Sequence, residues 1–238
     1  MSEELTVIIP IYNEEESLPA FFQEFDKLIS ASPMPLKALL VNDGSRDSSL
    51  TMIKDKCTSS PAYDYISFDR NYGLSAAIKA GFDHCTTSLV GYIDADLQTH
   101  PSDFLLYFPH FPEYDMVNGI RSKRQDSIVK KLSSKIANAY RRFMIDDGIT
   151  DTCCPLKIMK TEYARRMPFF TGMHRFMPAL VQLQGGKVKQ IPITHYPRLA
   201  GTSKYHLLNR LIGPFFDTLA FRWMRSRYIR YRVAERNR

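Results

Sequence analysis

The sequence predicts an α/β protein: a single Rossmann-like domain with a central, mostly parallel sheet and helices on both faces. Two observations predict it. Apolar runs rich in Val and Ile alternate with amphipathic helical segments in the first half. The 238 residues are also 44% hydrophobic, enough for one large core without disulfides or a structural metal. A helix that crosses over between successive strands makes those strands parallel, and such crossovers are right-handed.

The elements of the first half follow from this alternation. Residues 5–11 are an unbroken apolar run, typical of a strand buried on both faces. A helix is expected after Asn13, with Glu16 completing a capping box, and Pro33 ends it. The remaining elements are expected as strands over 36–41, 63–68 and 89–93, with helices over 47–56 and 74–84 between them.

The second half is less regular. A strand over 116–119 precedes a basic loop, and a long helix is expected over 127–144. Further strands are expected over 155–159 and 187–193, the latter near the sheet edge because Pro192 cannot donate a ladder hydrogen bond. The pattern predicts a catalytic domain over 1–204 and a basic amphipathic helical segment over 205–238, kinked at 213–214.

Polar loops follow the first four predicted strands, at 10–14, 42–46, 69–73 and 94–98. Ligands of open α/β sheets bind beyond the carboxyl ends of the strands. We therefore expect these four loops to meet around one crevice.

The loop 94–98, Asp-Ala-Asp-Leu-Gln, carries two carboxylates around a small residue. Oxygen ligands of this kind can hold Mg²⁺ or Mn²⁺ together with phosphate oxygens and water. The alternative is an ordinary turn in which Asp96 or Thr99 caps a helix that begins at Pro101. Asp43 has two interpretations as well, because Asn42-Asp43-Gly44-Ser45 is a turn signature and its carboxylate could also accept hydrogen bonds from a nucleobase.

Several classes of site are absent from the sequence. The glycine-rich Rossmann fingerprint and the Walker A loop are missing, so a phosphate would be bound through a metal and basic side chains. The four cysteines lack CxxC or Cys–His spacing, which favours reduced thiols and a cytosolic protein. The sequence also shows neither the pattern of a secretory signal nor an uncharged stretch of about 18 residues, so a membrane-spanning helix is not expected.

Six motifs, taken in their order along the chain, resemble those of family-2 glycosyltransferases of the GT-A fold. Within that family they resemble most the motifs of the dolichyl- and polyprenyl-phosphate sugar transferases. The resemblance spans about 7–223 and is carried by residues 7–14, 41–47, 70–77, 94–98, 119–127, and Arg198 with 201–205. The chain departs from the family pattern at Asn42, where Asp is commoner, and at Cys153, where Gly usually precedes the next Cys.

The resemblance implies a role for each matching residue. Base and ribose of a nucleotide sugar would be cradled by Pro10, Tyr12, Glu14 and Asp43, with Asp94 near the ribose or sugar phosphate. Mg²⁺ or Mn²⁺ would be held by Asp96 and Gln98. The acceptor phosphate and the departing nucleotide would face Arg121, Arg198, Ser203 and Lys204. The catalytic set would be Asp94, Asp96, Arg121, Arg198 and Lys204. The diphosphate would also contact His174 and Arg175, unless these form an ordinary surface pair at a helix N-terminus.

The chemistry of such a transfer is consistent with these roles. The departing nucleotide gains negative charge, which a cation and basic side chains stabilise. A phosphate acceptor is already ionised, whereas a hydroxyl acceptor needs a general base, for which Asp146, Asp147 and Asp151 are the nearest candidates. The expected function is inverting transfer of a hexose from a UDP- or GDP-sugar to polyprenyl phosphate. Transfer to a glycan or glycolipid hydroxyl in cell-envelope polysaccharide synthesis, and non-catalytic nucleotide-sugar binding, are the alternatives.

The net charge of +7 is concentrated at the C-terminus, where 222–238 hold seven arginines and one glutamate. A basic helix with an aromatic, apolar face suits an anionic bilayer surface. We therefore expect a peripheral protein on the cytosolic face of a membrane. Nucleic-acid binding, or packing on the protein's own domain or on a second copy, are the alternative interpretations. The sequence leaves open whether the chain works with a separate membrane subunit or as a homo-oligomer.

Overall fold

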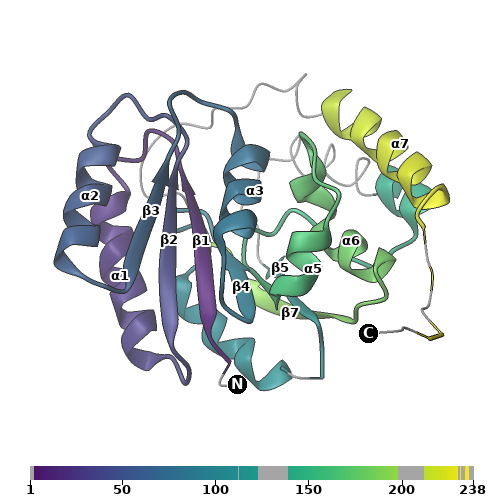
Figure 1. The fold of residues 1–238 in the computed structure, drawn as a ribbon, viewed down its shortest axis with the longest axis horizontal. Coiled ribbons are helices and arrows are strands. Elements are labelled where there is room, and N and C mark those ends of the chain that lie inside the picture. Colours follow the sequence, from purple (N-terminus) through teal and green to yellow (C-terminus); the bar gives the residue numbers. More distant parts are fainter. Residues whose placement is uncertain are drawn as a thin grey trace.

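The computed structural model describes residues 3–111, 113–122, 139–197, 212–229, 231 and 234–235. Seven strands form one sheet in the order β3-β2-β1-β4-β6-β5-β7 (Figure 1). The strands are β1 (Leu5–Ile11), β2 (Leu36–Asn42), β3 (Tyr63–Ser67), β4 (Leu89–Tyr92), β5 (Met116–Ser122), β6 (Lys157–Lys160) and β7 (Val188–Thr194).

Six of these strands run in the same direction. The pairs β1–β2, β2–β3, β1–β4 and β5–β7 are parallel, and β6 alone is antiparallel to its neighbours β4 and β5. The carboxyl ends of the six parallel strands therefore lie at one edge of the sheet, called the rim below. The edge position predicted from Pro192 is confirmed, because β7 is the last strand of the order.

Helices cover both faces of the sheet, so the predicted fold class is confirmed. Alternate residues of β1 point to opposite cores: Val7 and Ile9 pack on one side and Ile8 on the other. The first face carries α1 (Leu18–Ala31), α2 (Ser49–Ser59), η1 (Pro101–Leu106) and η2 (Phe108–His110). The second carries α3 (Leu74–His84), α5 (Thr161–Arg166), η3 (Met173–Phe176), α6 (Met177–Leu183) and α7 (Ile212–Ser226).

The predicted start of the first helix is wrong. Helix α1 begins at Leu18, and Asn13 lies before it with a φ of 52°. The Asn13 side chain instead accepts the Arg46 amide hydrogen at 2.8 Å. A tertiary contact therefore replaces the local cap, because the loop after β2 uses the oxygen that a capping box would need.

Two further expectations fall partly outside the described residues. Of the helix predicted over 127–144, only residues 139–144 are described; they are helical, and the helix continues to Ile145. The segment before Ile212 is also outside, so the predicted kink at 213–214 and the predicted domain boundary after Lys204 stay predictions. In the parts of the chain that the structure covers, every helix is too short or too polar to cross a lipid bilayer.

Candidate active site at the rim of the sheet

The loops after β1 and β2 are held together by reciprocal hydrogen bonds. The Asn13 amide donates to Ser45 Oγ at 3.0 Å, and the Glu14 amide donates to Ser49 Oγ at 2.9 Å. In return, the Ser48 amide donates to a Glu15 carboxylate oxygen at 2.9 Å. The predicted donor-binding residues Pro10, Tyr12 and Glu14 thus lie at the end of β1 and in a loop fixed by its neighbour.

Asp43 joins the loop after β2 to the loop after β3. Its carboxylate accepts the Tyr72 and Gly73 amide hydrogens at 2.6 and 2.9 Å, and the Asn71 side-chain amide at 2.9 Å. The side chain is only 3% exposed, and burial raises its pKa although the two backbone amides oppose that shift. A carboxylate offers about four acceptor positions, so these three donors leave room for one more.

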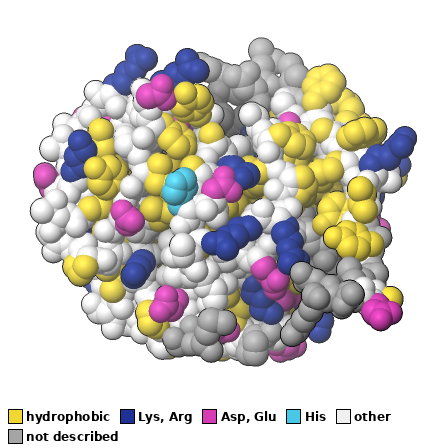
Figure 2. All heavy atoms as spheres, viewed as in Figure 1, with side chains coloured by type: hydrophobic (Ala, Val, Ile, Leu, Met, Phe, Trp, Pro, Cys, Tyr) yellow, Lys and Arg dark blue, Asp and Glu magenta, His cyan; other side chains and the backbone are white. Residues whose placement is uncertain are grey.

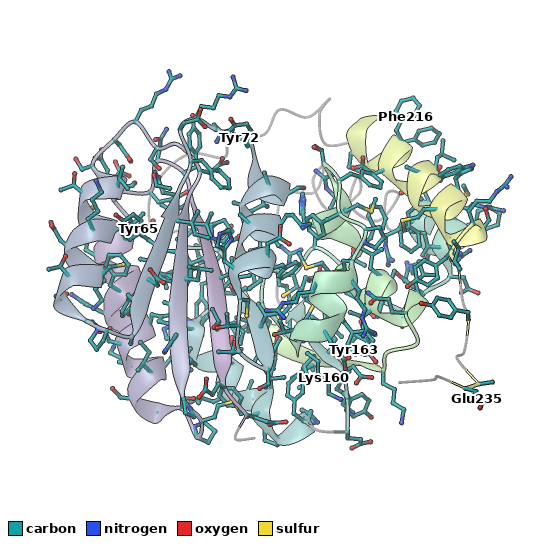
Figure 3. All side chains as sticks on the ribbon, viewed as in Figure 1. Tyr65, Tyr72, Lys160, Tyr163, Phe216 and Glu235 are labelled. Carbon is teal, nitrogen blue, oxygen red and sulfur yellow. The ribbon has the colours of Figure 1, made fainter. Side chains whose placement is uncertain are left out.

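Gly44 allows this close approach. It has a φ of +65°, and a Cβ there would lie 2.3 Å from the Arg70 carbonyl carbon. Two residues of the loop after β3 project from the rim. Tyr72 is half exposed, and the Arg70 guanidinium lies 4.9 Å from the centre of the Tyr72 ring (Figure 3). The loops after β2 and β3 therefore pack backbone to backbone, with an aromatic and a basic side chain at the surface.

The loop with the two candidate metal-binding carboxylates follows β4. Asp94 accepts a hydrogen bond from the Tyr92 hydroxyl at 2.6 Å, and Asp96, 5% exposed, accepts the Gln98 amide hydrogen at 3.1 Å. Leu97, between Asp96 and Gln98, has a φ of 55°, a conformation that is costly for a leucine. Backbone strain of this kind is concentrated at binding and catalytic sites.

The alternative role of Asp96 or Thr99 as a helix cap is wrong. The N-cap of η1 is His100, whose Nδ1 accepts the Ser102 amide hydrogen at 3.4 Å. Asp96 closes the tight turn to Gln98.

The oxygen atoms of this loop fit a hard divalent cation. Two carboxylates and the Gln98 side-chain carbonyl are the ligand types that Mg²⁺ and Mn²⁺ prefer. Among the described residues no group of three His, Cys, Asp or Glu side chains could hold a metal alone. A cation here would therefore need oxygens from a bound diphosphate or from water.

Asp43 and Asp96 open onto the same edge of the sheet. They follow β2 and β4, which flank β1 on either side. Neighbouring strands are about 4.8 Å apart, so the two loops begin roughly 10 Å from each other. This separation is short enough for both to contact one nucleotide.

On the other side of the rim, charged residues form buried ion pairs. Arg121 donates from Nε and Nη2 to the Asp151 carboxylate at 2.8 and 2.9 Å. Burial by itself would raise the pKa of Asp151, but the hydrogen bonds and charge of Arg121 outweigh it and hold that pKa below its usual value. Asp147 is paired in the same way with Arg141 at 2.6 Å. Both carboxylates are therefore held in ion pairs with arginines, and the lowered pKa of Asp151 makes that carboxylate a weak base.

His174 lies beside the first turn of α3. Its Nδ1 is 2.7 Å from Ser75 Oγ, which also accepts the Gly172 amide hydrogen at 3.0 Å. Burial, with smaller effects from the charges of Arg175 and Lys157, lowers the pKa of His174 to about 3. The imidazole is therefore neutral, and its Nδ1 forms a hydrogen bond with Ser75 Oγ in which the donor depends on the tautomer. Arg175 differs, because its Nη1 donates to Asp217 of α7 at 2.6 Å.

Lys157 is a buried charge that the sequence analysis missed. Its ammonium donates to Asn118 Oδ1 at 2.6 Å, to the Thr152 carbonyl at 3.0 Å and to the Cys154 carbonyl. Burial lowers its pKa, and its charge helps to lower the pKa values of His174 and Asp151. A single lysine between Leu156 and Ile158 in a predicted buried strand was the signal that could have found it.

The remaining predicted site residues, Arg198, Ser203 and Lys204, lie outside the described residues. Of the others, the structure brings Pro10, Tyr12, Glu14, Asp43, Asp94, Asp96, Gln98, Arg121 and His174 to the rim or to elements that touch it. Arg175 points instead to α7.

Comparison with known proteins agrees with this geometry. The family model described as "Glycosyl transferase family 2" matches residues 6–167. The undecaprenyl-phosphate 4-deoxy-4-formamido-L-arabinose transferase of Klebsiella pneumoniae is 32% identical over 217 residues, covering 90% of this chain. The chain spans 66% of that relative's length.

Two solved structures share the fold. Mannosyl-3-phosphoglycerate synthase of Rubrobacter xylanophilus superposes with a TM-score of 0.71 at 18% identity, covering 99% of this chain and 79% of the other. Glucosyl-3-phosphoglycerate synthase of Mycobacterium tuberculosis, solved with Mn²⁺, UDP and glucosyl-3-phosphoglycerate, superposes with a TM-score of 0.69 at 15% identity, covering 92% and 80%. At these identities the likeness concerns the fold.

The resemblance predicted from the six motifs is thereby confirmed at the level of family and fold. The model match begins one residue into β1 and ends one residue after α5, so it includes the loops after β1 to β5 but neither the turn that carries His174 nor the segment after β7. The chain belongs to glycosyl transferase family 2.

Proposed function

We propose that the chain is an inverting glycosyltransferase that moves a hexose from a UDP- or GDP-sugar onto polyprenyl phosphate. The observation that carries the choice of acceptor is the pairing of Asp147 and Asp151 with arginines. Two of the three candidate bases are therefore committed to ion pairs. A phosphate acceptor needs no base, and the Klebsiella relative is named for a phosphate acceptor of this class.

The donor half of the site would be the interlocked loops after β1, β2 and β3. The acceptor position left on Asp43 would take a hydrogen from the base, and Tyr12 with Glu14 would contact base and ribose. Asp96 and Gln98 would hold Mg²⁺ or Mn²⁺ on the diphosphate, and the Mycobacterium structure with Mn²⁺ and UDP supports a cation in this fold. Such a cation neutralises charge on the departing diphosphate.

The reaction would be a direct displacement. An oxygen of the acceptor phosphate attacks the anomeric carbon, and the bond from that carbon to the diphosphate oxygen breaks on the opposite side. An α-linked donor then gives a β-linked polyprenyl-phosphate sugar. Arg121 would contribute positive charge at the acceptor side, with Asp151 fixing its guanidinium in a bidentate geometry.

The direct test is a transfer assay. Purified protein is incubated with radiolabelled UDP- and GDP-sugars, undecaprenyl phosphate and Mn²⁺ or Mg²⁺, and label is counted in the lipid extract. We expect label that mild acid releases, because a glycosyl phosphodiester is acid-labile. Label that resists mild acid would indicate transfer to a hydroxyl, and donor binding without transfer would indicate a non-catalytic binding protein.

We propose further that the enzyme works on an anionic membrane surface, which it contacts through α7 and the helical residues 139–145. Figure 2 shows hydrophobic side chains gathered over α7. Trp223, Phe216 and Phe143 are 68%, 62% and 83% exposed. The exposed ionic groups of residues 213–229 are Arg222, Arg225 and Arg227. An apolar stripe flanked by arginines matches the apolar interior and anionic headgroups of a bilayer.

Vesicle sedimentation tests this contact. Replacing Phe216 and Trp223 by Ser should reduce binding to phosphatidylglycerol vesicles at least tenfold, because both side chains would insert below the headgroups. Tyr65→Ser is the matched control, since Tyr65 is an exposed aromatic residue on β3, far from α7 (Figure 3). Equal sedimentation of the double variant and the control would exclude α7 as the contact. Removing 222–238 should release the protein as well.

A further inference from the structure

Helix α7 contacts the turn that carries His174. The Asp217 carboxylate lies directly over Gly172, where an added Cβ would be only 2.3 Å from Asp217 Oδ2. The same oxygen accepts a hydrogen bond from Arg175 Nη1 at 2.6 Å. Gly172 has a φ of +95°, a conformation that favours glycine, and a side chain at this position would displace the Asp217 carboxylate. One carboxylate thus contacts both ends of a four-residue stretch.

Apolar packing reinforces this contact. The rings of Phe176 and Phe221 are stacked at 5.2 Å with an angle of 14°, and both side chains are fully buried. Phe221 follows Asp217 by one helical turn, so the two residues lie on the same face of α7. That face is opposite the exposed stripe of Phe216 and Trp223.

The other side of the turn contacts the donor half of the site. Ser75 Oγ binds both the Gly172 amide and His174 Nδ1, and Ser75 lies in the first turn of α3. Two residues earlier, Gly73 donates its amide hydrogen to Asp43. Asp217 is therefore linked to Asp43 by successive contacts: its approach to Gly172 and its ion pair with Arg175, the Gly172–Ser75 hydrogen bond, the short stretch 73–75, and the Gly73–Asp43 hydrogen bond.

We propose that Asp217 is a positioning residue: from α7 it fixes the turn at 172–175 and, through Ser75, the loop after β3 that binds the nucleotide sugar. Asp217 touches neither donor nor acceptor in this arrangement. The donor-site part rests on the proposed function, whereas the mechanical link from α7 to the loop after β3 rests on contacts alone.

The test compares Asp217→Asn with a matched control. Asparagine keeps the size of the side chain but removes the charge that holds Arg175. Asp83→Asn is the control, because Asp83 forms an exposed ion pair with Lys79 at the far end of α3. We expect amide hydrogen exchange in 69–77 and 170–176 to become at least tenfold faster in Asp217→Asn and to stay unchanged in the control. Unchanged exchange in 69–77 would overturn the proposal.

A second measurement separates positioning from general loss of stability. The KM for the nucleotide-sugar donor that the transfer assay identifies should rise about tenfold in Asp217→Asn, with kcat within about threefold of the wild type. A fall in kcat at unchanged KM would overturn the donor-site role. Titration with UDP and GDP in the presence of Mn²⁺ distinguishes a failure of the proposed function from a failure of the proposed link between α7 and the loop after β3. If the wild type binds neither nucleotide, the proposed function fails, whereas amide exchange still decides the link from α7.

Discussion

The two halves of the rim use their carboxylates in opposite ways. On the side of β1 to β4, Asp43, Asp47 and Asp96 accept hydrogen bonds mainly from backbone amides, so they shape the loops that carry them. On the other side, Asp147, Asp151 and Asp217 are paired with arginines. The first side therefore uses its carboxylates to organise loops, and the second uses them to fix guanidinium groups in place.

The largest effect is expected on the acidic side. Asp96→Ala should lower turnover by about 10³-fold, because the diphosphate would lose the cation that neutralises its developing charge. The thermal midpoint should change little, and Asp55→Ala, at an exposed position on α2, serves as the control. Initial rates at saturating Mn²⁺ are the measurement. A variant with full activity would remove the metal role from Asp96.

A smaller effect on stability is expected on the basic side. Arg121→Ala should lower the free energy of unfolding by about 3–5 kcal/mol, because Asp151 would be left as a buried, unpaired charge. The double variant Arg121→Ala, Asp151→Ala should recover most of that loss in urea unfolding but none of the activity. Equal stability of the two variants would mean that the ion pair is not buried as described, and restored activity would remove Arg121 from catalysis.

The smallest effect concerns pH and His174, which links the two sides. Its pKa of about 3 in the folded protein lies below the unfolded value of about 6.5. Neutral His174 therefore contributes stability that is present above pH 6.5 and is lost as the pH falls toward 3, at no more than about 1.4 kcal/mol per pH unit.

His174→Gln isolates this contribution, because a glutamine side chain can still form a hydrogen bond with Ser75 but does not titrate. Between pH 7 and 4.5 the wild type should lose about 2 kcal/mol more than the variant in urea unfolding. Parallel pH profiles for the two proteins would show that the imidazole is solvated in the folded state.

The sequence by itself determined the alternation of strands and helices in the first half and the place of its four polar loops. Both follow from local patterns: apolar runs bounded by turn residues, with the functional side chains directly after them. Pro192 gave the edge position of β7 for the same local reason. The family resemblance, carried by contiguous motifs, was also confirmed.

Tertiary structure decided what those side chains bind. Asn13 gives its oxygen to the loop after β2 instead of capping α1, and Asp43 organises the loop after β3. Arg175 was predicted beside the diphosphate, yet it binds Asp217, which lies 42 residues away in the sequence. Lys157 is held by three acceptors that no spacing rule connects. Ion pairs and buried hydrogen bonds join segments distant in sequence, so their partners are set by packing rather than by local pattern.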